Sequence, residues 1–179
     1  MIDVFTLIES IWLILPAYAA NGLVPLFKGK HVMDGGKKFI DRMRLFGDGK
    51  TWEGFIGGCV IGVLIATIEM LAFPYLPFDQ SPVTLTIVEM TPLLGFLLGF
   101  GAMLGDLMGS FIKRRLKIER GGKAPLLDQL DFLVGALACS ALIVRIKIEW
   151  VVWLFILTPI FHLIANRIGY LLKVKSVPW

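Results

Sequence analysis

Five long apolar segments constrain the fold of this chain most, because each is about as long as a helix that crosses a bilayer. They cover 4–27, 54–76, 92–112, 124–144 and 150–172. A transmembrane helix needs about 20 mostly apolar residues, and open strands cannot satisfy their backbone hydrogen bonds in lipid. The sequence therefore predicts an all-α integral membrane protein with five transmembrane helices, folded as a single domain over residues 1–179.

The composition agrees with this class. Of the 179 residues, 56% are hydrophobic and 18% are charged, whereas soluble domains carry about 25% charged residues. The fourth segment is the weakest, because its charge-free stretch is only the 13 residues Phe132–Val144. The two cysteines, Cys59 and Cys139, both lie in apolar runs, which indicates neither a disulfide framework nor a cysteine-rich zinc site.

The distribution of positive charge predicts the orientation. The loop 28–53, the loop 113–131 and the C-terminal end together carry 16 Lys and Arg residues, whereas the opposite side carries two. Positive residues stay on the cytoplasmic side, so we expect the N-terminus outside, the C-terminus inside and two basic cytoplasmic loops that form the polar site. This topology accounts for most of the net charge of +4, so the charge does not indicate a nucleic-acid partner.

The first predicted cytoplasmic loop contains two Asp-Gly elements, Asp34-Gly35 and Asp48-Gly49. The second runs on through Lys50 and Thr51 directly before an apolar segment. Glycine permits close approach of the backbone, and a helix N-terminus offers free N–H groups to an anion. The pattern favours a phosphate-binding turn, and the alternative is an ordinary turn in which Thr51 caps the helix.

Carboxylates mark the inner ends of the third and fourth segments. Asp106 lies seven residues, or about 10 Å, before Lys113, and at i, i+4 and i+7 Asp106, Ser110 and Lys113 share one helix face. An ionisable residue at that depth is usually functional. The alternative is a single ion pair, to Lys113 or to a neighbouring helix.

Asp128 and Asp131, spaced i and i+3, share a face at the start of the fourth segment. Acidic residues also suit the first turn of a helix, so capping is the alternative function. Three carboxylates at one membrane face, beside Lys and Arg, are nevertheless typical ligands of Mg²⁺, which is usually held by two carboxylates together with substrate phosphates.

Other polar residues in the apolar segments predict less. Asn21, near the inner end of the first segment, either faces the inner site or packs between helices. Glu9 and Glu69 lie in the outer halves of the first two segments, and we expect them to form hydrogen bonds between helices.

Four motifs together carry a family resemblance. They are Pro16-Ala-Tyr-Ala-Ala-Asn21, Phe46-Gly-Asp-Gly-Lys-Thr-Trp52, Gly105-Asp-Leu-Met-Gly-Ser-Phe-Ile-Lys-Arg-Arg115 and Ala124-Pro-Leu-Leu-Asp-Gln-Leu-Asp131. In these motifs the chain resembles the CDP-archaeol synthases, archaeal membrane enzymes related to the CDP-diacylglycerol synthases. The resemblance implies transfer of CMP from CTP to the phosphate of an unsaturated archaeal ether lipid, 2,3-di-O-geranylgeranylglycerol 1-phosphate.

The resemblance also implies site residues and a cofactor. Mg²⁺ and CTP are the expected cofactor and donor, with Asp106, Asp128 and Asp131 holding the metal and the triphosphate. The turn Asp48-Gly49-Lys50-Thr51 is expected to contact the nucleotide. We further expect Asn21, Asp34 and Ser110 to line the substrate site.

An acceptor phosphate is already ionised and needs no general base, so charge neutralisation and positioning remain as the work of the protein. The basic residues Lys50, Lys113, Arg114 and Lys123 are therefore predicted to neutralise the pyrophosphate and the lipid phosphate, with Lys113 at the catalytic centre. A transporter is the main alternative, but its ionisable residues should cluster near the bilayer midplane. Here they gather at one face.

Overall fold

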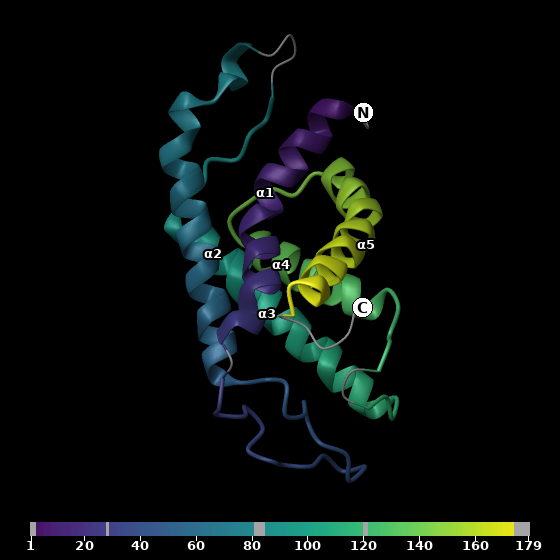
Figure 1. Cartoon of the computed structure of the whole chain (residues 1–179). Coiled ribbons are helices and arrows are strands. Elements are labelled where there is room, and N and C mark those ends of the chain that lie inside the picture. Colours follow the sequence, from purple (N-terminus) through teal and green to yellow (C-terminus); the bar gives the residue numbers. More distant parts are fainter. Residues whose placement is uncertain (1–2, 28, 81–84, 120–121, 174–179) are drawn as a thin grey trace.

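The computed structural model describes residues 3–27, 29–80, 85–119 and 122–173. Its regular structure is helical, and Figure 1 shows long helices that run beside one another. The helices are α1 Val4–Leu23, α2 Trp52–Ala72, α3 Pro92–Arg115, α4 Leu127–Ser140 and α5 Ile148–Leu171, with short 3₁₀ turns at Val24–Phe27, Phe73–Tyr75 and Pro77–Gln80.

Within the described residues, four helices are long and apolar enough to cross a membrane. With their adjoining turns they are Val4–Phe27, Trp52–Tyr75, Pro92–Arg115 and Ile148–Leu171. The fourth predicted segment is shorter, because α4 has 14 residues and a helix of that length spans about 21 Å of a hydrocarbon core about 30 Å thick. Five membrane crossings and their orientation thus stay predictions, and three of the counted basic residues, Lys28, Arg120 and Lys175, lie outside the described residues.

Of the helix boundaries that differ from the prediction, two bear on the candidate site residues. α3 runs to Arg115, so its last turn carries Lys113, and cations there interact favourably with the helix dipole. α4 begins at Leu127, and its N-cap residue Leu126 has a φ of 65°. Pro125 therefore stands in the connection before α4 instead of opening the helix, and Asp131 lies in the second turn.

Glycine lets the central helices approach closely. A Cβ on Gly62 of α2 would collide with the backbone of Gly95 and Gly99 on α3. Likewise, Gly101 of α3 and Gly135 of α4 each face the other's backbone. Small residues at helix contacts are typical of membrane bundles, and here they set α3 between α2 and α4.

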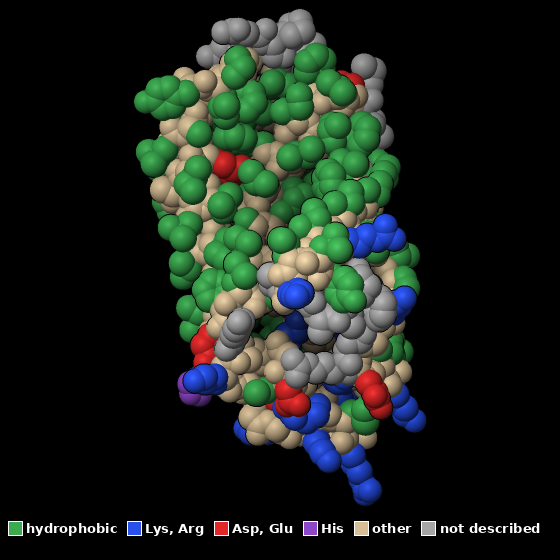
Figure 2. Space-filling view, viewed as in Figure 1, with side chains coloured by type: hydrophobic (Ala, Val, Ile, Leu, Met, Phe, Trp, Pro, Cys, Tyr) green, Lys and Arg blue, Asp and Glu red, His purple; other side chains and the backbone are tan. Residues whose placement is uncertain are grey.

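The outward side of α2 is apolar. Ile56, Val60, Leu64 and Ile68 follow one another at intervals of four residues, and all four are at least half exposed. The space-filling view shows hydrophobic side chains over most of the upper part of the molecule and charged side chains gathered at its lower end (Figure 2). This arrangement is the reverse of a soluble helix, whose exposed face is polar, and fits a surface in contact with lipid.

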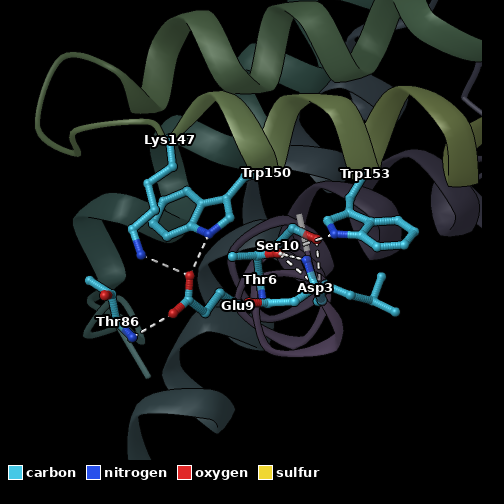
Figure 3. Close-up of polar contacts among 9 residues, drawn as sticks. Asp3, Thr6, Glu9, Ser10, Thr86, Lys147, Trp150 and Trp153 are labelled. Atoms are coloured by element: carbon cyan, nitrogen blue, oxygen red, sulfur yellow. Dashed lines mark hydrogen bonds and ion pairs between the residues drawn. The ribbon is translucent and has the colours of Figure 1, made fainter. Parts of the chain in front are cut away.

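A buried carboxylate joins three segments at the end opposite the basic loops. Glu9 of α1, 3% exposed, accepts hydrogen bonds from Trp150 Nε1 at 2.7 Å and from Lys147 Nζ at 2.9 Å. It also accepts one from the backbone N–H of Thr86 at 2.6 Å. The three donors converge on its two oxygen atoms (Figure 3), which confirms the expected bonding between helices for Glu9. The same expectation is wrong for Glu69 of α2, whose buried carboxyl oxygens accept no hydrogen bond from the described residues.

Candidate active site

The basic loop before α2 folds around one aspartate. Asp34, 4% exposed, accepts hydrogen bonds from Arg44 Nη2 at 2.5 Å and from the backbone N–H groups of Gly36, Phe46 and Gly47 at 2.9–3.1 Å. Burial alone would raise the pKa of Asp34, but the hydrogen bonds from Arg44 and from these amides outweigh it and hold the pKa well below its usual value. Asp34 therefore organises the loop from within.

Arg115, the last residue of α3, docks this loop against the helix. Its Nε lies 2.6 Å from Asp41 Oδ2, and its Nη2 donates to the carbonyl of Arg44 at 2.7 Å. The guanidinium also lies over the ring of Phe39, 5.0 Å from its centroid, and over that of Phe111 at 4.6 Å. In Figure 1 the loop between α1 and α2 lies at the lower end of the molecule, near the C-terminal end of α3.

The two ends of the loop meet in a short antiparallel pairing that places Lys50. The backbone N–H of Met33 donates to the carbonyl of Lys50 at 2.8 Å, and the backbone N–H of Trp52 donates to the carbonyl of His31 at 2.9 Å. Lys50 then extends its ammonium group to Asp106 Oδ2 on α3. This ion pair joins residues 56 positions apart in the chain.

Lys50 and Asp106 line a small pocket. The turn residues Gly49 and Thr51 line it too, together with the start of α2. Thr51 caps that helix, since its hydroxyl accepts from the N–H of Gly54 at 3.3 Å. The capping alternative is therefore confirmed for Thr51, and the same turn also borders a pocket with a lysine and a carboxylate.

Asp131 of α4 turns toward α3. A Cβ on Gly109 would collide with the Asp131 carboxylate, and one on Gly105 would collide with its backbone carbonyl. The charges of Asp106, Lys50 and Asp128 all act on this carboxylate. Asp128, one turn earlier, pairs with Lys113 Nζ at 2.6 Å. The alternative of an ion pair between Asp106 and Lys113 is therefore wrong: Asp106 pairs with Lys50 and Lys113 pairs with Asp128.

The chemistry of these carboxylates fits a hard cation such as Mg²⁺, which takes oxygen ligands. Their geometry is not that of a closed cage: within the described ranges, no three His, Cys, Asp or Glu side chains are grouped so as to hold a metal ion. Asp106, Asp128 and Asp131 could hold one only together with oxygens from another molecule. This is the usual arrangement for Mg²⁺, which keeps few protein ligands and binds substrate phosphates.

The next predicted site residues lie either on α3 or in the connections between helices. Ser110 is buried one turn beyond Asp106, and Arg114 follows Lys113 with a buried Nε. Asp48 pairs with Arg44 Nη1 at 2.7 Å, outside the pocket, and Lys123 is exposed in the connection between α3 and α4. Asp34 and Asp48 are thus held by the loop itself and do not face the pocket.

Asn21 belongs to a second, larger cleft between α1, α4 and α5. Apolar side chains provide most of its lining, which includes Phe132 of α4 and Phe161 of α5. Polar groups meet inside it, where the Tyr18 hydroxyl lies 2.7 Å from Thr158 Oγ1. The cleft and the smaller pocket both border the C-terminal end of α1, because Asn21 lines the cleft and Val24, the C-cap of α1, lines the pocket.

Comparison with known proteins identifies the family. The model of the CarS-like family, described as CDP-archaeol synthase, matches residues 1–179. The chain belongs to the CDP-archaeol synthase family. The predicted resemblance is therefore confirmed, and this membership supports the lipid-enzyme prediction and not the transporter alternative.

Relatives named CDP-archaeol synthase match almost end to end. The protein of Thermococcus gammatolerans is 45% identical over 170 residues, 95% of each chain. That of Methanocaldococcus jannaschii is 43% identical over 173 residues, 97% of each chain. A solved structure of an intramembrane enzyme for archaeal membrane lipids biosynthesis matches with a TM-score of 0.76 at 38% identity, over 89% of this chain and 94% of that one. The CDP-archaeol synthase family thus accounts for both the sequence and the fold of this membrane protein.

The sequence analysis missed Arg44 and Arg115, which build and dock the loop. Both side chains act through partners that are not their helical neighbours: Arg44 reaches Asp34, and Arg115 reaches Asp41. The only local signal was the set of aromatic residues Phe39, Phe46 and Phe111, whose rings contact one another across loop and helix. Such a set predicts a docked loop, but not which cation joins it.

Proposed function

We propose that this chain transfers CMP from CTP to the phosphate of an unsaturated archaeal ether lipid, giving a CDP-archaeol lipid and pyrophosphate. One observation carries the proposal: in a chain of this family, Lys50, Asp106, Lys113 and Asp128 meet in two ion pairs beside Asp131 at the charged end of the molecule. Cations and carboxylates side by side suit a reaction between a triphosphate and a phosphate monoester.

The reaction needs positioning more than proton transfer. A phosphate monoester has its second pKa near 6, so at neutral pH an oxygen of the lipid phosphate can attack directly. The new bond joins that oxygen to the α-phosphorus of CTP, and the bond to the β-phosphate breaks, so that pyrophosphate leaves with the electron pair. Lys50, Lys113 and Arg114 would neutralise the charge on the leaving group.

Mg²⁺ is part of the proposal. Asp106, Asp128 and Asp131 would hold it together with oxygens of the triphosphate. When bound, the cation supplies neutralisation of the phosphate charge. The pocket at Gly49, Lys50 and Thr51 would receive the triphosphate, since the Lys50 ammonium attracts anions.

The cleft between α1 and α5 would receive the lipid acceptor. Its lining is mostly apolar, as isoprenoid chains require, and Asn21, Tyr18 and Thr158 offer groups that bond to ether and phosphate oxygens. Because the cleft and the nucleotide pocket both border the C-terminal end of α1, the two substrates would meet near the carboxylates of α3 and α4. With the predicted orientation, this site faces the cytoplasm.

A transfer assay tests the function. Detergent-purified protein would receive labelled CTP, Mg²⁺ and either digeranylgeranylglycerol 1-phosphate or a diacylglycerol 3-phosphate. We expect a labelled CDP-lipid with the ether acceptor and its loss on adding EDTA. Product with the diacyl acceptor alone would contradict the assigned substrate, and no product with either acceptor from folded protein would contradict the activity.

A further inference from the structure

We propose that Lys50 and Lys113 are exchangeable counter-ions, which hold the carboxylates of Asp106 and Asp128 and release them when a nucleoside triphosphate binds. The divalent cation and the nucleotide would then bind cooperatively, because each makes room for the other. This inference rests on the proposed function, and it adds the order and coupling of binding to it.

The two pairs occupy the atoms that a cation needs. Lys50 Nζ contacts Asp106 Oδ2, and Lys113 Nζ lies 2.6 Å from Asp128 Oδ1. An ammonium group and a metal ion both bind the lone pairs of a carboxylate oxygen. At each of these two oxygens, lysine and cation therefore compete.

The three carboxylates need such counter-ions to lie together. The negative charges of Asp106 and Asp128 both act on Asp131, and Lys50 opposes them. The two ammonium groups offset the charges of Asp106 and Asp128, which reduces the repulsion that would otherwise separate α3 from α4. A cation that displaced only one of the two lysines would leave the ammonium group of the other lysine next to it, and the two positive charges would repel each other.

Both lysines can move without a change of fold. The Lys50 side chain is 24% exposed and that of Lys113 is 17% exposed, so each ammonium already reaches the polar end of the molecule. A lysine carries its charge on a flexible four-carbon stem. Lys50 also lines the pocket with Gly49 and Thr51, so a triphosphate seated there would lie within reach of its ammonium group.

Exchange predicts a reciprocal coupling. A nucleotide that draws the lysines to its phosphates frees the carboxylate oxygens and raises the affinity for the cation. By thermodynamic linkage the cation must raise the affinity for the nucleotide by the same factor. Such factors are commonly about 5 to 150.

The experiment measures binding and not turnover. Full-length protein in detergent is titrated with Mn²⁺, read by electron paramagnetic resonance, with and without a CTP analogue that cannot transfer CMP. We expect the analogue to tighten Mn²⁺ binding to the wild type at least about tenfold. In Lys50→Met and in Lys113→Met, Mn²⁺ alone should bind about tenfold more tightly than to the wild type, and the factor due to the analogue should fall below the wild-type factor, to the part that direct coordination by the triphosphate supplies.

Matched controls separate exchange from general charge. Lys30→Met and Lys37→Met each remove one positive charge from exposed positions of the loop before α2, and both should keep the wild-type coupling. Lys50→Arg keeps the ion pair, so it should bind Mn²⁺ alone no more tightly than the wild type. It also provides a folded variant should Lys50→Met not fold.

Three results would overturn the proposal. They are equal Mn²⁺ affinity of the wild type with and without the analogue, a lysine-to-methionine variant that binds Mn²⁺ alone no more tightly than the wild type, and Lys50→Arg that binds it tenfold more tightly. Since none of these measurements uses transfer, the wild-type assay with lipid acceptor reports separately on the proposed function.

Discussion

At Gly109, the absence of a side chain gives the Asp131 carboxylate its room. The carboxylate lies where a Cβ of residue 109 would stand, so α3 and α4 can bring Asp106 and Asp131 near each other only with glycine at this position. Asp131 contributes its charge and Gly109 contributes the space, although the sequence motif marks both residues alike.

We predict that Gly109→Ala lowers kcat by about 100-fold or more, because the added methyl group displaces a charge that must be held within about 0.5 Å. Asp131→Asn should cost at least as much, and transfer of label from CTP to lipid measures both. The double variant Gly109→Ala/Asp131→Asn should be no worse than Asp131→Asn alone, since both changes act on one group. Additive losses in this cycle would show that Gly109 acts elsewhere.

The loop before α2 is a folded element with its own charged centre. Asp34 draws together Arg44 and three backbone amides, and Arg115 fixes the assembled loop to α3. The loop then presents Lys50 to Asp106, although no helix or sheet forms within its own residues 29–51. Precise placement of a catalytic group on a loop requires such internal bonding.

This centre predicts how the loop responds to pH. The pKa of Asp34 is lowered in the folded loop, so the ionised carboxylate stabilises the fold of the loop. This stabilisation is complete above the pKa of an aspartate in the unfolded chain, near 3.9. It is lost as the pH falls through the lower pKa of Asp34 in the folded loop. Amide exchange at Phe46 and Gly47, corrected for intrinsic rates, should thus stay slow from pH 7 to pH 5 and accelerate in stronger acid. Asp34→Asn should accelerate it about tenfold already at pH 7, which corresponds to about 1.4 kcal/mol.

Asp41→Asn is the control for this prediction. It changes an aspartate of the same loop whose carboxylate pairs with Arg115 and is partly exposed, so exchange at Phe46 and Gly47 should change less than in Asp34→Asn. Equal acceleration in both variants, or none in Asp34→Asn, would place the centre of the loop elsewhere.

At the scale of the whole molecule, the chain divides its polar groups between two ends. One end holds the basic loop, the lysines and the three carboxylates, and the other holds Glu9 with Lys147 and Trp150 (Figure 3). Helices with apolar outward faces and glycine contacts connect the ends. Glu9 fixes α1 to α5 far from the site, so its contribution is to stability.

Glu9→Ala should therefore lower the free energy of unfolding by about 1–3 kcal/mol, because the donors Trp150 and Lys147 lose their common acceptor. Thermal unfolding in detergent, followed by tryptophan fluorescence, measures the change. Glu9→Gln keeps an acceptor oxygen and should lose less. The specific transfer activity of the folded fraction should match the wild type in both variants, and an unchanged melting temperature for Glu9→Ala would contradict this role.

Local sequence determined the class of the protein and its candidate residues. A membrane helix contacts lipid, so its sequence is a long hydrophobic run, and such runs revealed α1, α2, α3 and α5. The family motifs identified the carboxylates and the turn that contains Lys50. The length of α4 was less evident, because α4 ends at Ser140 although the apolar run continues beyond it.

Only the tertiary structure decided which charges meet. Lys113 lies on the same helix face as Asp106 by spacing, yet it pairs with Asp128, and Lys50 crosses from the loop to Asp106. Likewise, Glu9 finds Lys147 across 138 positions of the chain. Periodicity places a residue on a face of its own helix, but the partner depends on how closely glycines let the helices pack and on how the loop folds, which are properties of the assembled molecule.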